Sequence, residues 1–135
     1  MAQLLEWNES LETGVDEIDS DHRCLIALAN RIHTAAQAGN REEVADLVLE
    51  FCNYCDDHFV MEEEFMRDIH YPQRLEHKRD HDQMLADLDK IMGKVRSNLD
   101  ASAVMAEFIF RWTANHVLII ERQLAEFVRA RRAAG

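Results

Sequence analysis

The sequence contains very little that would interrupt a helix, since only four of its 135 residues are glycine and one is proline. This scarcity excludes a fold that depends on many tight turns. No stretch has low complexity or the composition of a flexible linker. The abundant Glu, Lys, Arg, Leu and Ala favour long helices. We therefore expect a single domain over residues 1–135, with one sizeable core.

Cysteine is also scarce, and Cys24, Cys52 and Cys55 cannot form a disulfide framework. Cys52 and Cys55 are spaced as CxxC, but they lie within a helical pattern and no second CxxC completes a zinc site. We interpret all three as small buried or half-buried thiols.

Positive charge is in short supply, and the formal net charge of −11 argues against nucleic acid or an anionic membrane as a partner. The basic tail at residues 129–132 is too short to reverse this balance. No apolar run approaches the roughly 20 residues that cross a bilayer, and the start MAQLLEWNES lacks the features of a signal peptide. We expect a soluble, cytoplasmic protein.

Turn signals divide the chain into four expected helices. Asp19–Asp21 supply N-cap residue types for the first, and Asn40 with Glu43 resembles a capping box for the second. His70–Pro72 form a break before the third, and Ser97–Asp100 separate the third from the fourth. Residues 1–18 are expected to be extended, with Leu4, Leu5 and Trp7 against the bundle. The helices then cover about 19–39, 40–67, 72–95 and 101–130, within a bundle at 19–131.

The stretch HFVMEEEFM places His58 and Glu62 four residues apart among apolar side chains. Steps of four and three residues connect them to one apolar stripe, and each other helix has a similar stripe. Such heptad-like stripes face the centre of an up-down-up-down four-helix bundle, so we expect an all-α fold of this kind. The stripes are His22, Leu25, Ala29, Ile32; Val44, Val48, Phe51, Cys55, His58, Glu62, Phe65; His77, His81, Met84, Leu88, Ile91, Val95; and Met105, Ile109, Trp112, His116, Ile119.

Every stripe carries side chains that bind metals. Residues four apart on a helix lie about 5–6 Å apart at Cβ, so HxxxE and HxxxH can each close on one ion. Burying these groups without a metal would be costly. Imidazoles with carboxylates suit iron, zinc or manganese, and their number suggests two ions. The inward set is His22, His58, Glu62, His77, His81 and His116.

Two other metal sites fit less well. The ferritin-like carboxylate type needs Glu-x-x-His, and no histidine here has a glutamate three residues before it. The segment His77-Lys78-Arg79-Asp80-His81 is close to the HxxEH pattern of zinc hydrolases. That pattern requires a glutamate as the base, and it leaves His22, His58 and His116 unused.

The whole array resembles the hemerythrins, specifically the bacterial hemerythrin-like domains. The matching elements are Ile18-Asp19-x-x-His22, HFxxEE at residues 58–63, HKxxH at residues 77–81, and Trp112-x-x-Asn115-His116. They span nearly the whole chain in the family's order. The resemblance implies a pair of non-haem irons (Fe2+/Fe3+), joined by an oxo or hydroxo bridge, that binds dioxygen reversibly.

By the same resemblance, three histidines (His77, His81 and His116) saturate one iron. His22 and His58 hold the other, whose open position meets dioxygen, and Glu62 bridges the two. The family's second bridging carboxylate is usually Asp, five residues after the last histidine; here that residue is Glu121. Five residues turn an α-helix by about 500°, so Glu121 must reach back toward His116. The implied oxygen pocket consists of Phe59, Trp112, Thr113 and Val117, with Thr113 where the family commonly has a bulky apolar residue.

Several polar residues receive no role in this scheme. His33 lies on the stripe of His22, but about 16 Å along the axis. His70 is expected to be solvated, and Glu63 and Glu64 are expected to point away and only add charge near the site.

The main expected function is carriage, storage or delivery of oxygen, without catalysis. The alternative is an oxygen or redox sensor domain of a signalling protein, and a di-iron peroxidase-like or oxidase-like enzyme is the third possibility. An oxygen-consuming enzyme or a signalling protein would be the partner.

Overall fold

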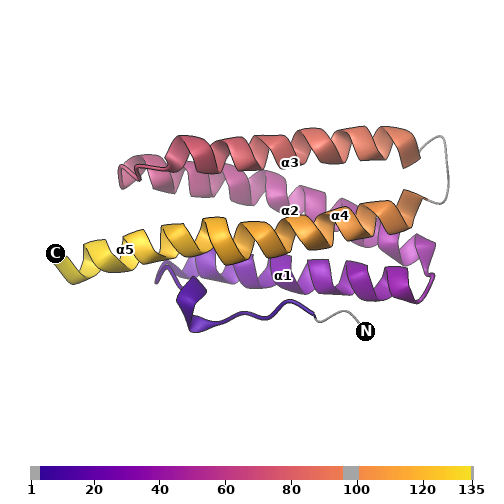
Figure 1. Ribbon diagram of the computed structural model, residues 1–135, viewed down its shortest axis with the longest axis horizontal. Coiled ribbons are helices and arrows are strands. Elements are labelled where there is room, and N and C mark those ends of the chain that lie inside the picture. Colours follow the sequence, from indigo (N-terminus) through magenta and orange to yellow (C-terminus); the bar gives the residue numbers. More distant parts are fainter. Residues whose placement is uncertain (1–3, 96–100, 135) are drawn as a thin grey trace.

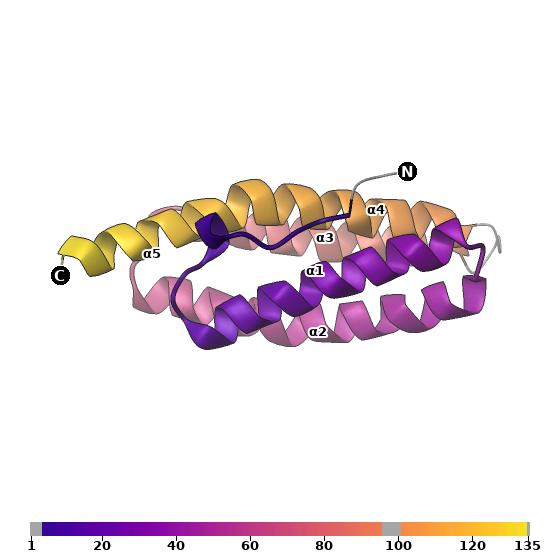
Figure 2. The ribbon, with the colours of Figure 1, turned by 90° about the horizontal axis from the view of Figure 1, so that it is seen from below.

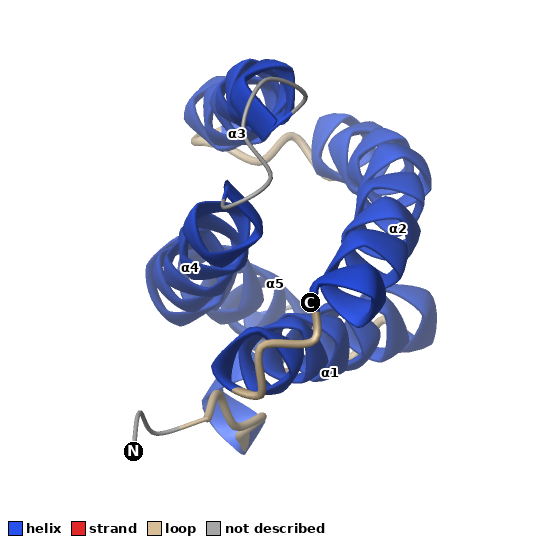
Figure 3. Cartoon of the chain, turned by 90° about the vertical axis from the view of Figure 1, so that its right-hand side faces the viewer, coloured by secondary structure: helices blue, strands red, loops and turns tan. Residues whose placement is uncertain are grey.

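The computed structural model describes residues 4–95 and 101–134, and all regular structure in these residues is helical. Consecutive long helices run in opposite directions (Figure 1) and surround a common centre when viewed along the bundle (Figure 3). The expected all-α four-helix bundle is therefore confirmed. The elements are η1 (Glu9–Leu11), α1 (Asp16–Gln37), α2 (Arg41–Asp68), α3 (Arg74–Val95), α4 (Ala101–Asn115), η2 (His116–Glu121) and α5 (Arg122–Ala134).

The core follows the predicted stripes closely. All of the first stripe is buried, and so are the residues of the second except Phe65, which is half-buried. Ile91 and Trp112 are half-buried, whereas the side chain of Val95 lies outside the described residues, as does the predicted break at Ser97–Asp100. The prediction for Ile119 is wrong, because its side chain is 51% exposed. Burial of each large apolar side chain contributes about 1.5–3 kcal/mol to the bundle.

The first helix begins earlier than predicted. It starts at Asp16, so Asp19–Asp21 lie inside the helix and do not cap it. The buried carboxylate of Asp19 instead accepts hydrogen bonds from the backbone N–H groups of Thr13 and Gly14 and from the Thr13 hydroxyl, at 2.8–3.0 Å. Gly14 has a φ of +82°, which glycine adopts without steric cost. Asp19 therefore fixes the turn that leads into the helix.

The cap of the second helix is as predicted, since the Glu43 N–H donates to the Asn40 side chain. The N-terminal segment runs along the outside of the bundle (Figure 2). Leu5 is fixed there by two hydrogen bonds to the Asn30 side chain, and it packs against the core with Trp7. Leu4 was expected to pack in the same way but is 46% exposed.

The fourth helix corrects one expectation. By length and mean hydropathy, Ser102–Ala134 is long and apolar enough to cross a membrane, whereas we expected no such segment. In this fold its apolar face packs as one quarter of the bundle, against α1 and α3. Core helices of bundles often have this composition.

Candidate metal centre

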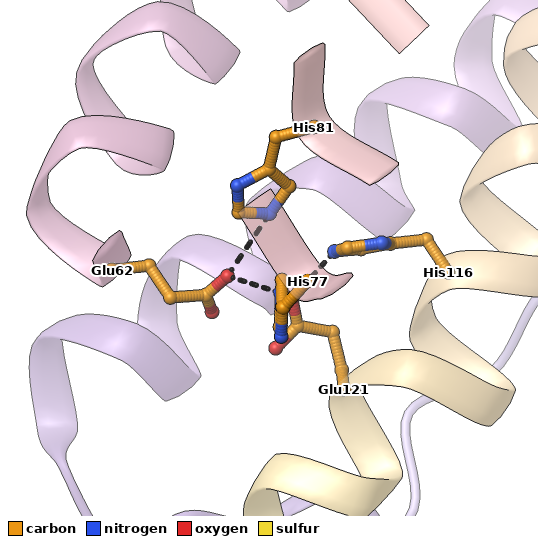
Figure 4. A group of neighbouring side chains, drawn as sticks. All are labelled: Glu62, His77, His81, His116 and Glu121. Atoms are coloured by element: carbon orange, nitrogen blue, oxygen red, sulfur yellow. Dashed lines mark hydrogen bonds and ion pairs between the residues drawn. The ribbon is translucent and has the colours of Figure 1, made fainter. Parts of the chain in front are cut away.

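Seven side chains converge on the central axis of the bundle. They come from α1, α2, α3 and the fourth helix, which consists of α4, η2 and α5. Each was predicted from the sequence as a ligand, and none is more than 4% exposed. Five of them are drawn in Figure 4, where the imidazoles and carboxylates point toward one another. They form two overlapping groups that share both carboxylates: His77, His81, His116 with Glu62 and Glu121, and His22, His58 with Glu62 and Glu121.

The two oxygens of Glu62 face different groups. Its Oε1 lies 2.9 Å from His77 Nε2 and 3.2 Å from His81 Nε2. Its Oε2 lies 2.8 Å from His22 Nε2 and 3.4 Å from His58 Nε2. One carboxylate therefore offers one oxygen to the three-histidine group and the other to the two-histidine group.

Glu121 divides its oxygens in the same way. Its Oε1 lies 2.6 Å from His116 Nε2 and 2.9 Å from His77 Nε2, whereas its Oε2 lies 3.1 Å from His22 Nε2. Since Glu121 is fully buried, it is part of the centre and not a residue of the surface.

A π-helical turn explains how Glu121 reaches His116. Residues His116–Glu121 form η2, in which hydrogen bonds join residues five apart, so His116 and Glu121 lie on one side of the helix. In a regular α-helix they would be about 140° apart. Within this turn Ile119 is exposed and Val117 is buried. Single π-helical turns occur often at functional sites.

The donor atoms fit metal ions. Five imidazole Nε2 atoms and four carboxylate oxygens meet, and the ligand atoms within each group all lie within 4.8 Å of one another. With metal–ligand bonds of about 2.1 Å, neighbouring ligands of one ion are about 3–4 Å apart. Within the described residues, the buried Nε2 atoms of His58 and His81 and one oxygen each of Glu62 and Glu121 have no hydrogen-bond partner. Cations between these atoms would satisfy them.

Without a metal, the buried groups pair as ions. Burial opposes a charge on His77, but Glu121 and Glu62 raise its pKa from 6.5 to about 10. Burial alone would raise the pKa of Glu62, yet His77 and His22 hold it well below its usual 4.5. The metal-free centre therefore retains protons, which an incoming cation must displace.

We expect the metal-free protein to be most stable between about pH 4.5 and 6.5, because in that range both Glu62 and His77 are charged even when unfolded. The raised pKa of His77 means that its contribution is lost as the pH rises toward 10. The depressed pKa of Glu62 means that its contribution is lost at low pH. Metal affinity should change in the opposite direction, since binding releases protons. Between about pH 6.5 and 9, the melting temperature of the metal-free protein should fall, whereas that of the zinc-loaded protein should rise. If both melting temperatures changed with pH in the same way, the proposed ion pairing in the metal-free centre would be wrong.

Three residues beside the ligands were missed by the sequence analysis. The Nδ1 atom of His81 lies 2.9 Å from a carboxylate oxygen of Glu63, so Glu63 is off the central stripe as predicted, but the prediction that it only adds charge near the site is wrong. Asp21 and Asp80 make equivalent contacts to His58 and His116, at 2.9 and 2.5 Å. The signal was the position of each carboxylate next to a ligand in the sequence.

Two of the four residues of the predicted oxygen pocket pack directly on ligand histidines. The Phe59 ring stacks on His81 with 3.8 Å between the ring centroids, and the Trp112 ring stacks on His116 with 4.4 Å between theirs. Val117 instead packs with Leu11 and Ile26. Thr113 is buried, and its hydroxyl has no partner among the described residues.

The other two histidines lie apart from the centre. His33 stacks on Phe110, and His70 is exposed in the turn before α3 with a φ of +54°. Cys24, Cys52 and Cys55 are free thiols, half-buried or buried as expected.

Comparison with known proteins gives one consistent result. The family model described as the hemerythrin HHE cation binding domain matches residues 13–128. A bacteriohemerythrin of Stenotrophomonas maltophilia is 31% identical over 94% of this chain and 83% of its own length. Bacteriohemerythrins of Methylococcus capsulatus and Clostridium acetobutylicum are 28% and 25% identical, over 88% and 89% of this chain and 92% and 98% of their own lengths.

Proposed function

Because the chain belongs to the hemerythrin HHE cation-binding family, we propose that it binds dioxygen reversibly at a pair of non-haem irons. Its role is to carry, store or deliver oxygen inside the cell, and it is a binding protein, not an enzyme. The observation that carries this proposal is the division of both carboxylates, each of which presents one oxygen to members of the three-histidine group and the other to the two-histidine group.

The two sets of histidines assign the residues to the two ions. His77, His81 and His116 would hold one iron, while His22 and His58 would hold the other. Glu62 and Glu121 would join the two ions, because each has one oxygen on either side. The ion held by the set with one imidazole fewer would have a position available for an exogenous ligand. When bound, two ferrous ions supply the two electrons that reduce dioxygen and take them back on its release.

Aromatic side chains cover the three-histidine side of the centre. Phe59 and Trp112 cover the imidazoles of His81 and His116 with stacked rings, and apolar cover of this kind restricts access of water. The Thr113 hydroxyl and the Trp112 indole N–H are buried without partners in the described part of the chain. Both can donate a hydrogen bond, which suits a reduced oxygen ligand that accepts one.

We expect the purified protein to contain two irons per chain, since seven ligands are too many for one ion. The test is metal analysis together with an optical spectrum of the reduced protein before and after admission of air. Reversible dioxygen binding predicts a new absorption that disappears when oxygen is removed. The zinc-loaded protein is the control and should show no change in air. One iron per chain, or a spectrum that air changes irreversibly, would contradict the proposal.

A further inference from the structure

The outward-facing nitrogens of three ligand histidines each meet a carboxylate. The Nδ1 atoms of His58, His81 and His116 lie 2.9, 2.9 and 2.5 Å from oxygens of Asp21, Glu63 and Asp80, respectively. These three carboxylates are similarly placed, with side chains that are 24%, 23% and 27% exposed. They lie between the buried centre and the solvent.

The three contacts follow one rule along the chain. Asp21 adjoins His22, Glu63 adjoins Glu62, and Asp80 adjoins His81. Each carboxylate is therefore next in sequence to a ligand of its own helix, and it contacts a ligand histidine of the following helix of the bundle. The contacts join α1 to α2, α2 to α3, and α3 to η2 in order. The Nδ1 atoms of His22 and His77 have no such partner among the described residues.

We propose that Asp21, Glu63 and Asp80 are positioning residues that orient the ligand histidines of the neighbouring helix and adjust the electron density at the metals. The proposal rests on the proposed iron-binding function. An imidazole whose Nδ1–H donates to a carboxylate has its Nε2 lone pair free for the metal, so the contact selects the ligating tautomer. The carboxylate also makes the imidazole a stronger electron donor.

The distribution of these carboxylates is unequal. Glu63 and Asp80 act on two of the three histidines assigned to one iron, whereas Asp21 acts on one of the two assigned to the other. Tyr54 restrains Asp21 further, because its hydroxyl donates to the second oxygen of that carboxylate at 2.9 Å. Additional negative charge near an iron favours its ferric state, so loss of a carboxylate should raise the reduction potential.

Two adjacent glutamates provide a matched test. Glu63→Gln removes the carboxylate beside His81, while Glu64→Gln removes the same charge from an exposed neighbour. The first readout is zinc affinity, by competition with a chelator, which requires neither iron nor dioxygen. We expect Glu63→Gln to bind zinc about 10-fold more weakly or worse, and Glu64→Gln to bind it like the wild type.

The second readout is the reduction potential of the iron-loaded protein, which should rise in Glu63→Gln and stay unchanged in Glu64→Gln. Asp80→Asn tests the same idea independently at His116, with exposed Asp82→Asn as its control. If each variant matches its control in both zinc affinity and potential, the positioning role is wrong. If the wild type instead fails to bind dioxygen, the proposed function fails, and the zinc affinities still decide the role of the carboxylates.

Discussion

His77→Ala is expected to abolish stable binding of two irons and to lower the melting temperature of the metal-free protein by roughly 10 °C. His77 Nε2 lies 2.9 Å from an oxygen of Glu62 and 2.9 Å from an oxygen of Glu121. Removing the imidazole takes a ligand from one iron and a neutralising cation from two fully buried carboxylates. Breaking a buried ion pair costs about 3–5 kcal/mol of stability. Weaker metal binding also lowers the stability of the iron-loaded protein, because the free energy of metal binding contributes to folding.

His33→Ala is the matched control for this variant. It makes the same substitution at a half-buried histidine that stacks on Phe110 and belongs to neither group of candidate ligands in the described residues. We expect it to retain two irons and to lose only a modest packing contribution. Iron content and thermal melts of both variants, with and without metal, provide the comparison. Two irons retained in His77→Ala would exclude His77 as a ligand.

The helices and most of the ligands were predictable because both depend on spacing within one helix. A step of three or four residues returns to the same face, so His58 and Glu62 had to share the face of Phe51 and Cys55. Burial of that stripe in the structure is a direct consequence of its pattern. The convergence of four such stripes required only that the helices form a bundle.

The π-helical turn was not predictable by the same reasoning. Periodicity of 3.6 residues placed Ile119 inside and left Glu121 far from His116. In the structure Ile119 is exposed and Glu121 lies beside His116, because the π-helical turn η2 contains one residue more than an α-helical turn. Intrinsic helix propensities do not distinguish an α-helical turn from a π-helical one. The burial of Glu121 beside His116, His77 and His22 is a tertiary effect.

Contacts between helices were the other omission. Glu63 lies about 100° around its helix from Glu62, so its own helix indicates only that it is off the central stripe. Its contact with His81 depends on how closely α3 approaches α2. Similarly, Asp19 is an N-cap residue type, but its bonds to Thr13 and Gly14 depend on the path of the preceding turn. Contacts between side chains of different elements cannot be predicted from residue spacing within one helix.

Glu121→Gln is expected to reduce the iron content from two ions to about one and to change the optical spectrum. Glutamine keeps the size of the side chain but has a single oxygen, so it cannot present one oxygen to His116 and His77 and the other to His22. Its amide would also leave buried N–H groups without acceptors, because Glu121 is 0% exposed. Loss of one negative charge beside two cations should weaken the retention of the second ion.

Glu121→Asp tests the length of the side chain separately from its charge. It keeps the carboxylate but shortens the arm by one methylene, about 1.5 Å. The π-helical turn already brings residue 121 to the side of His116, where Glu121 Oε1 lies 2.6 Å from Nε2. We therefore expect Glu121→Asp to retain two irons, with a shifted spectrum, because aspartate is the usual residue of the family at this position. Glu126→Gln, an exposed glutamate on α5, controls for the loss of charge and should behave as the wild type. If Glu121→Gln also retained two irons and the wild-type spectrum, Glu121 would not bridge the ions, and the π-helical turn would need another explanation.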